Sequence, residues 1–317
     1  MQASRLILVA ALMWACTTLT TAQQLNLFTQ YRENATLINP AAMETDFLAY
    51  GYNMTVGVSY RKQWAGISGS PTTQSVRFSY LNENRSGTSL NFGGYVLNDQ
   101  TGPTGFTGAY ARLGAVIGGN PEYGGLSLGI TAGYVGYRVN SSEINLRDPN
   151  DFIGLIDQSQ GHPDVGFGIY YYQLDRNDNM FYVGASVPQL LGFDLAFEDE
   201  EGQFSIQRVQ HIYGMAGYTI FARNGGMLEL SSWAKYVQGV PFNADFNIRY
   251  QMPTALYMGG GVSTAGNAHV EAGVTLGDNV GLDNIIRIGY GLDYSFSSFG
   301  PSVGGTHELQ ASITLDR

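Results

Sequence analysis

Apolar and polar residues alternate along most of this chain. In residues 243–250, every second residue from Ala244 to Tyr250 is apolar, and the residues between them are Asn243, Asp245, Asn247 and Arg249. Successive side chains of a β-strand point to opposite faces of the sheet. The segment therefore predicts a strand with one apolar face and one polar, charged face.

Fourteen segments carry this pattern, which predicts an all-β protein. They lie near residues 49–61, 73–82, 87–98, 104–118, 123–139, 163–174, 179–187, 207–222, 226–237, 241–251, 254–264, 267–276, 285–296 and 305–316. Many approach the roughly 9–11 residues that a tilted transmembrane strand needs. An even strand number is typical of single-chain bacterial barrels with both termini in the periplasm. We therefore expect a transmembrane antiparallel up-and-down β-barrel of about 14 strands over residues 49–317, with both termini periplasmic.

The connections between these segments support the same arrangement. The three longest, 62–72, 140–162 and 188–206, are all odd-numbered, whereas even-numbered connections such as 82–85 and 119–121 are tight-turn sequences. Outer-membrane barrels have long loops outside the cell and short turns in the periplasm. A pair of soluble β-sandwiches is the alternative, but the polar faces repeatedly carry Arg and Glu, which favours the membrane barrel.

The N-terminal residues have a different character. Residues 1–22 are typical of a secretory signal peptide, with Arg5 before an apolar run too short to span a bilayer and small residues Thr20 and Ala22 before a cleavage site at Gln23. A lipoprotein signal that uses Cys16 is the rival interpretation. Residues 23–48 show no clear alternation, so we expect them on the periplasmic side or tucked into the barrel mouth.

Composition changes this picture in two ways. Charged residues make up 13% of the chain, against about 25% in soluble domains, which suits a large surface outside water. Basic residues form no cluster, so nucleic acid is not an expected partner. Outer-membrane lipid is the expected surrounding of the apolar face.

Charges of both signs fall on the predicted polar faces. They are Arg61, Arg77, Glu229, Lys235, Asp245, Arg249, Glu271, Arg287, Asp293 and Glu308. Inside a barrel such residues either line a water channel or cross-link a closed lumen by ion pairs. A selective pore usually carries one sign, so the mixed signs favour a blocked or narrow lumen.

Catalytic and metal-binding motifs are weak in this sequence. His162, at the predicted end of an outer loop beside Pro163 and Asp164, is the best catalytic candidate, but such a histidine is more often structural. The sequence contains no Gly-x-Ser-x-Gly or His-Glu-x-x-His motif. Residues 175–179 begin like a calcium loop but lack its glycine and closing glutamate, so a hairpin turn is favoured. We predict no catalytic residue, no metal site and no cofactor.

Short motifs resemble one known family. They are Ile38-Asn39-Pro40-Ala41, Arg61-Lys62-Gln63-Trp64-Ala65-Gly66, Ser70-Pro71-Thr72-Thr73-Gln74 and, near the end, Ile288-Gly289-Tyr290-Gly291-Leu292-Asp293-Tyr294-Ser295 with His307-Glu308-Leu309. Together they resemble the PorP/SprF outer-membrane proteins of Bacteroidota, which are tied to type IX secretion and gliding motility. Two departures are Lys62, where the family commonly has Ser, and the absence of a terminal aromatic residue.

The resemblance implies a non-enzymatic outer-membrane barrel that helps to secrete or anchor cargo. The implied partners are type IX secretion components, the C-terminal sorting domain of a cargo protein, or a surface adhesin. It also marks Asn39, Pro40, Arg61, Gln63, Trp64, Gly66, Pro71, Thr72, Thr73 and Gln74 as candidate partner-binding or motif residues. Trp64 could equally be a protein-contact anchor or an aromatic residue at the membrane interface. The alternative function is a channel for small or hydrophobic solutes.

Overall fold

The computed structural model describes residues 28–140, 158–191, 194–199, 202–207, 209–296, 300 and 302–316. The predicted signal peptide lies outside these residues. No helix within the described ranges is long and apolar enough to cross a membrane.

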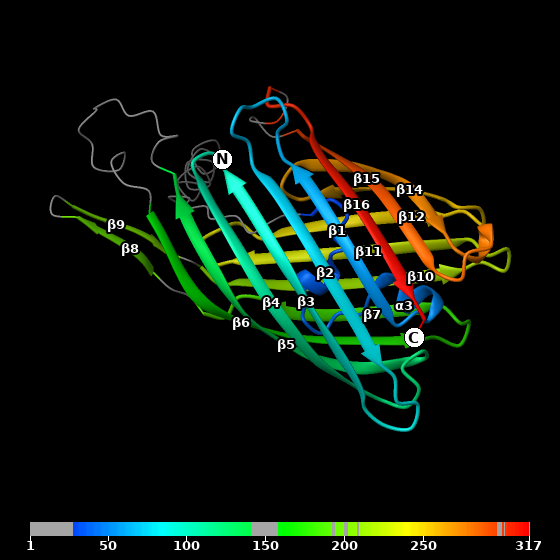
Figure 1. The fold of residues 1–317 in the computed structure, drawn as a ribbon. Coiled ribbons are helices and arrows are strands. Elements are labelled where there is room, and N and C mark those ends of the chain that lie inside the picture. The colour runs from blue at the N-terminus through cyan, green and yellow to red at the C-terminus, as the bar shows by residue number, and fades with distance from the viewer. Residues whose placement is uncertain are drawn as a thin grey trace, which may run out of the picture.

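Fourteen antiparallel strands form a closed barrel (Figure 1). They are β1 Met54–Lys62, β2 Thr72–Asn82, β3 Ser89–Thr101, β4 Thr104–Ile117, β5 Gly124–Val139, β6 Gln158–Leu174, β7 Met180–Val187, β10 His211–Phe221, β11 Met227–Val237, β12 Asn243–Gln251, β13 Leu256–Ser263, β14 Asn267–Leu276, β15 Ile285–Ser295 and β16 Thr306–Leu315. Each strand pairs with its neighbours in the chain, except that β7 pairs with β10 and β1 pairs with β16. The predicted up-and-down barrel is thereby confirmed, and the β1–β16 seam closes it.

Two strands lie outside the barrel, in a connection that the sequence predicts as a loop. β8 Asp194–Asp199 and β9 Gly202–Gln207 pair only with each other and project from one end of the barrel (Figure 1). A second difference concerns β6, which begins at Gln158 rather than near residue 163. Its first residues continue the pairing with the long strand β5, so His162 lies opposite Val135 in the sheet and not in a loop.

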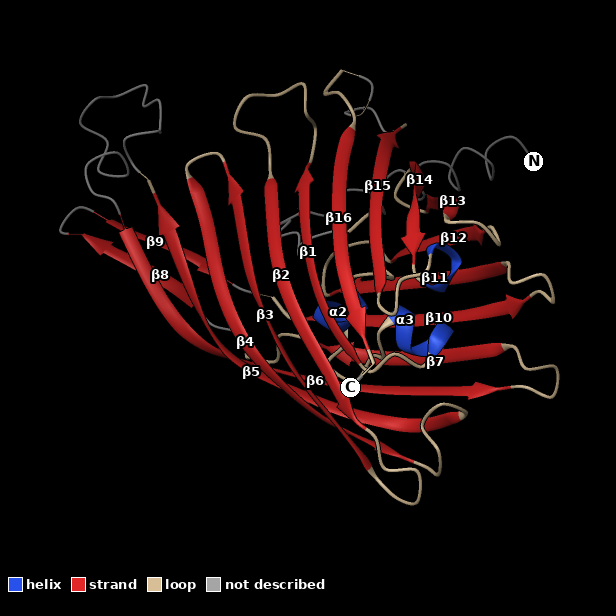
Figure 2. Cartoon of the chain, turned by 45° about the vertical axis from the view of Figure 1, so that its right-hand side comes forward, coloured by secondary structure: helices blue, strands red, loops and turns tan. Residues whose placement is uncertain are grey.

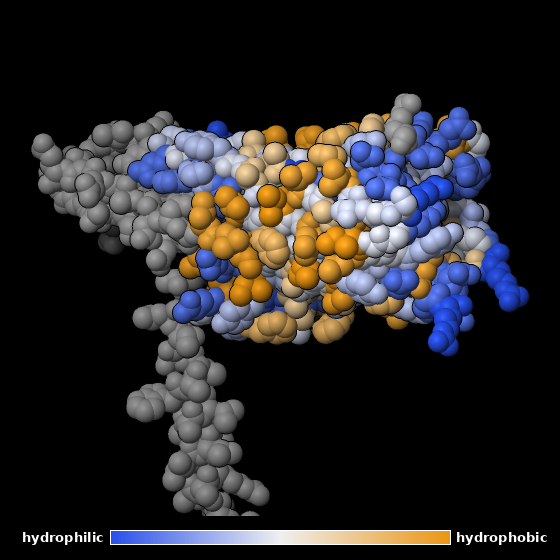
Figure 3. Space-filling model, turned by 90° about the horizontal axis from the view of Figure 1, so that it is seen from below, coloured by the Kyte–Doolittle hydropathy of each residue, from blue (hydrophilic) through white to orange (hydrophobic). Residues whose placement is uncertain are grey.

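The two faces of the wall follow the sequence alternation. In β1, Thr55, Ser59 and Arg61 are buried inside the barrel, whereas Val58 is 47% exposed on the outside. Exposed apolar residues recur on every second position of the other strands. Figure 3 shows these side chains as an apolar belt around the middle of the barrel, with hydrophilic residues at its ends.

The two ends of the barrel differ in their connections. One end, here the turn end, carries the connections 83–88, 118–123, 175–179, 222–226, 252–255 and 277–284, the last with the short 3-10 helix η3 Asp278–Val280. The opposite end, here the loop end, carries the longest connections, including 63–71, 188–210 and 296–305, together with the short connections 102–103, 238–242 and 264–266 (Figure 2). The last strand, β16, finishes at the turn end, where Leu315 pairs with Met54.

Residues 28–53 form a plug inside the barrel. Every residue from 28 to 44 is buried, and the plug contains the short helices α2 Ala35–Ile38 and α3 Thr45–Tyr50 (Figure 2). Pro40 disfavours helical backbone at the preceding residue, and α2 ends at Asn39 in an extended conformation. α3 ends at Gly51, whose φ of 78° is the left-handed conformation typical of a helix C-terminus.

The plug runs along the lumen from the loop end to the turn end. Thr29 bonds to Asp293 and Glu308 near the loop end, whereas Asp46 bonds to Thr314 near the turn end. The sequence led us to expect residues 23–48 beneath the barrel or in its mouth. The structure places residues 28–48 deeper, through most of the lumen, because the wall supplies partners for their charges and main-chain groups.

Candidate functional site

Ion pairs fasten the acidic residues of the plug to the wall. Glu33 pairs with Arg249 (Nη1 to Oε1, 2.5 Å) and Arg287 (Nε to Oε2, 3.7 Å), and Asp46 pairs with Arg287 (2.5 Å). Glu44 lies 3.7 Å from Arg77. All these side chains are less than a tenth exposed. The plug is therefore held by charges that water cannot screen.

One pair has the opposite polarity. Arg32 of the plug pairs with Glu229 of β11, and its guanidinium also lies 4.4 Å from the centre of the Tyr182 ring. Tyr182 itself donates a hydrogen bond of 2.9 Å to Glu229. This arrangement adds a cation–π contact to the ion pair.

The charges of plug and wall are complementary as sets. Around this part of the plug the wall carries four arginines and two glutamates, while the plug carries one arginine and three acidic residues. The wall residues are Arg77, Arg112, Arg249, Arg287, Glu229 and Glu271; the plug residues are Arg32, Glu33, Glu44 and Asp46. Removing one member of a buried pair leaves its partner uncompensated, which costs about 3–5 kcal/mol. The plug therefore fits this lumen electrostatically as well as sterically.

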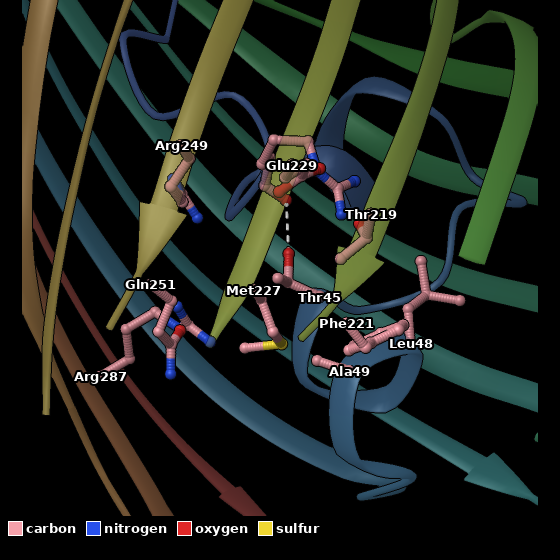
Figure 4. A pocket seen from close by; sticks show the side chains of 11 residues that line it. Thr45, Leu48, Ala49, Thr219, Phe221, Met227, Glu229, Arg249, Gln251 and Arg287 are labelled. Carbon is pink, nitrogen blue, oxygen red and sulfur yellow. Dashed lines mark hydrogen bonds and ion pairs between the residues drawn. The ribbon is translucent and has the colours of Figure 1, made fainter. Parts of the chain in front are cut away.

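A small cavity of about 30 Å³ remains between α3 and strands β10–β12. Figure 4 shows the wall and plug side chains around it, including Glu229, Arg249 and Leu48. The Thr45 hydroxyl donates a hydrogen bond of 3.2 Å to the main-chain oxygen of Arg32, drawn as a dashed line. The cavity has room for one or two water molecules beside the ion pairs.

The Asn39-Pro40-Ala41 motif forms a tight turn against the wall. Asn39 donates through Nδ2 to the main-chain oxygens of Ile169 (3.1 Å) and Ala185 (3.4 Å), and its Oδ1 accepts from the Ala41 amide (2.9 Å). Arg112 donates to the oxygen of Pro40 at 3.2 Å. The motif thus satisfies its own polar groups and those of β6 and β7.

Two wall glycines make room for this turn. A Cβ at Gly168 would clash with Oδ1 of Asn39, and one at Gly129 would clash with the main-chain oxygen of Pro40. Gly129 of β5 and Gly168 of β6 therefore leave the space in the wall that the Asn39-Pro40-Ala41 turn occupies. The sequence marked Asn39 and Pro40 but gave no sign of these partners.

Arg61 and Gln63 belong to a second cluster, at the loop end of the plug. Arg61 pairs with Asp293 (3.1 Å) and Glu308 (3.7 Å) and donates to Oε1 of Gln63 (3.1 Å). Glu308, fully buried, accepts the main-chain amides of Thr29 (2.7 Å) and Gln30 (3.2 Å). Arg61 therefore reaches the start of the plug through Glu308.

The rest of the motif shapes the loop 63–71. The amides of Ala65 and Gly66 donate to the main-chain oxygens of Gly305 (2.9 Å) and Val303 (3.0 Å), and Gln63 donates to Pro71 (2.9 Å). A Cβ at Gly66 would lie 2.9 Å from the Val303 oxygen, so only glycine fits. This loop is braced against the 296–305 connection.

The remaining motif residues also lie at the loop end of the barrel. Trp64 is half-buried, with φ of 51°. Thr72, Thr73 and Gln74 lie at the start of β2, where Thr73 faces inward and bonds to Asp99 (2.6 Å), while Gln74 is exposed on the outer face. The marked residues therefore separate into a plug turn, a lumen cluster and a braced loop.

The predicted lumen charges all lie on inward-facing wall positions. Five of them form ion pairs or hydrogen bonds with the plug: Arg77, Glu229, Arg249, Arg287 and Glu308. Asp293 also contacts the plug, because it accepts a hydrogen bond from the hydroxyl of Thr29. Asp245 instead pairs with Lys235 across β11 and β12 (2.5 Å). The plug charges themselves escaped the sequence reasoning, because residues 28–50 have no periodic pattern. No three His, Cys, Asp or Glu side chains converge as metal ligands in the part of the chain that the structure describes.

A closed barrel with an apolar outer belt defines the class: this is an outer-membrane β-barrel protein. The sequence matches the family described as "Type IX secretion system membrane protein PorP/SprF" over residues 20–313, so the chain belongs to that family. No curated protein matches it.

Solved structures of barrel proteins are similar to this chain at low identity. A FadL homologue from Pseudomonas aeruginosa has a TM-score of 0.52 and 9% identity, covering 90% of this chain and 94% of the other. The TodX deltaS2S3 mutant, a monoaromatic hydrocarbon channel, has a TM-score of 0.47 and 12% identity (89% and 93% covered). The translocator domain of the autotransporter NalP from Neisseria meningitidis has a TM-score of 0.45 and 12% identity (90% and 94% covered).

Proposed function

We propose that this barrel is a non-catalytic component of type IX secretion. It helps to secrete or anchor cargo that carries a C-terminal sorting domain, or a surface adhesin. Its membership of the PorP/SprF family over nearly the whole chain carries the proposal. The buried plug supports it, because a lumen filled from residue 28 to residue 44 suits a mount for partners better than a route for solutes.

The orientation is part of the proposal. Barrels of this class carry their short turns in the periplasm and their longer loops outside the cell. We therefore assign the turn end to the periplasm and the loop end to the exterior. The braced loop 63–71 then lies outside, where it offers Ile67, 36% exposed, on a rigid backbone. Rigid loops lose little conformational entropy on binding.

A gene deletion in the native host tests this function. We expect at least one sorting-domain protein to accumulate in the periplasm or to leave the cell surface, as measured by mass spectrometry of the periplasm, the surface and the medium. Restoring the full gene should reverse the change. A version that lacks residues 1–22 should not, since it cannot reach the outer membrane. An unchanged surface and secreted proteome would overturn the proposal.

A further inference from the structure

The turn end of the barrel contains an open cup that the plug does not fill. The cavity measures about 590 Å³, within the usual range for ligand pockets. It lies between α3 and the connections 83–88, 118–123 and 175–179. Its size far exceeds that of the cavity of about 30 Å³ beside the ion pairs.

The floor and one wall of the cup are apolar. α3 contributes Phe47 and Leu48, and the strands contribute Leu174, Met180 and Phe221. Phe47 is fixed from behind by an edge-on contact with Tyr172, with ring centres 6.4 Å apart. Tyr123, 59% exposed, stands beside the opening.

The rim of the cup is acidic. Glu83, Glu122, Asp178 and Asp316 all border it, and Arg85 is the one cation among the described residues that line it. Arg85 pairs with Glu122 at 2.9 Å, and among the described residues Glu83, Asp178 and Asp316 form no ion pair within 4 Å. Burial, together with the nearby charges of Glu122 and Asp316, raises the pKa of Glu83. The rim therefore favours an added positive charge.

We propose that the cup binds a short basic and apolar peptide segment of a periplasmic protein. A Lys or Arg side chain pairs with Glu83, Asp178 or Asp316, and a neighbouring apolar side chain covers Phe47 and Leu48. The proposal rests on the proposed function only for placing the turn end in the periplasm. The acidic rim repels phosphate groups, which disfavours lipid headgroups and nucleic acid.

An occupant of the cup touches the plug directly. Leu48 and Phe47 belong to α3, the same helix whose Asp46 is tied to Arg287 in the lumen. A partner seated here therefore contacts the element that closes the barrel. This coupling distinguishes the cup from an ordinary surface patch.

Peptide binding to the purified barrel tests the site. The probe is a fluorescent pentapeptide Lys-Phe-Leu-Lys-Phe, compared with Glu-Phe-Leu-Glu-Phe, by fluorescence anisotropy in detergent. We expect the basic peptide alone to bind, more weakly at high salt. The double variant Glu83→Gln/Asp178→Asn should weaken its binding about 5- to 10-fold, since each exposed charge pair contributes modestly. Tyr123→Ser should also weaken it, by a few-fold.

Asp283→Asn is the matched control, because Asp283 is an exposed acidic residue of the turn end that does not line the cup. It should change binding less than twofold. Equal binding of both peptides, or equal loss in the control and the double variant, would overturn the proposed cup. Circular dichroism confirms that each variant keeps its barrel.

A labelling experiment tests the orientation of the barrel separately from peptide binding to the cup. Ser86 is exposed in the connection 83–88 at the edge of the cup. Ser86→Cys should react with a membrane-impermeant maleimide only after the outer membrane is opened. Reaction in intact cells would place the cup outside and exclude a periplasmic partner. Failed peptide binding with correct labelling would refute the cup and leave the secretion function intact.

Discussion

Glu33 is the residue on which the plug depends most. It pairs with both Arg249 and Arg287, and all three side chains are at most 7% exposed. We expect Glu33→Gln to destabilise the seated plug by about 1–3 kcal/mol, because Arg249 and Arg287 each lose one buried carboxylate but keep a second, Glu271 and Asp46. Glu122→Gln is the control, since its pair with Arg85 is largely exposed and such pairs contribute about 0–1 kcal/mol. Hydrogen exchange of residues 28–50 measures the stability of the seated plug in the two variants.

Gly168 gives a steric test of the Asn39 turn. A Cβ at this position clashes with Oδ1 of Asn39, so Gly168→Ala should displace the turn and speed hydrogen exchange of residues 38–42. Gly214→Ala is the matched strand control, because its Cβ would lie 3.6 Å from the nearest atom, Cβ of Ala234, in ordinary contact. Equal exchange in the two variants would contradict the proposed fit between turn and wall.

Sequence could predict the inward charges but not their partners. Arg249 stands on the polar face of an alternating strand, so its place inside the barrel follows from period 2 alone. Glu33 lies in a stretch without period, and it meets Arg249 across 216 positions of sequence. A contact of that range depends on the closed barrel, which no local pattern contains. The Asn39-Pro40-Ala41 motif could be recognised because its residues are contiguous in the sequence. Gly129 and Gly168 lie far from it along the chain, so no local pattern linked them to it.

At the element scale, the β6–β7 connection is a turn built on one carboxylate. Asp175 Oδ1 accepts the amides of Asn177 (2.7 Å) and Asn179 (3.0 Å), and Oδ2 accepts the Tyr218 hydroxyl (2.5 Å). The hydroxyl of Tyr218, followed by these amides, holds the pKa of Asp175 below its ordinary value. This is the hairpin turn favoured by the sequence over a calcium loop.

The pH dependence of this turn follows from that lowered pKa. The stabilising contribution of Asp175 is full above its ordinary pKa of 3.8 and is lost as pH falls through the lowered value. Asp175→Asn should therefore lower the thermal stability of the barrel at pH 7, and the difference from the natural protein should shrink as pH falls well below 3.8. Thermal unfolding in detergent across this range measures it. A difference independent of pH would contradict the carboxylate's role.

The elements were predictable where one face meets lipid and the other meets the lumen. All fourteen barrel strands follow the alternation, since lipid enforces it. The β8–β9 hairpin and the early start of β6 at Gln158 were missed because both lie at the loop end, away from the middle of the wall whose two faces meet lipid and lumen. The plug was missed as an element for a related reason. It is buried on all sides by charged and apolar wall groups alike, so its residues show no single face.

For the whole molecule, the mixed charges predicted a blocked lumen, and the structure shows how the lumen is filled. Around residues 32–46, wall and plug divide the charge unequally: four arginines and two glutamates on the wall face one arginine and three acidic residues on the plug. Neither part is balanced alone. The lumen is filled by the chain's own N-terminal segment, and buried ion pairs join that segment to the wall.

Conductance in planar bilayers tests this reading of the molecule. We expect the natural protein to show no steady conductance, because residues 28–44 are buried in the lumen. Deleting residues 28–50 should open a pore with steady conductance in KCl, because the segment that fills the lumen is gone. Should the deletion fail to fold, the double variant Glu33→Gln/Asp46→Asn, which removes the partners of Arg287, should give brief openings. A steady conductance of the natural protein would instead support a solute channel, and a deletion variant that keeps its barrel but does not conduct would contradict closure by the plug.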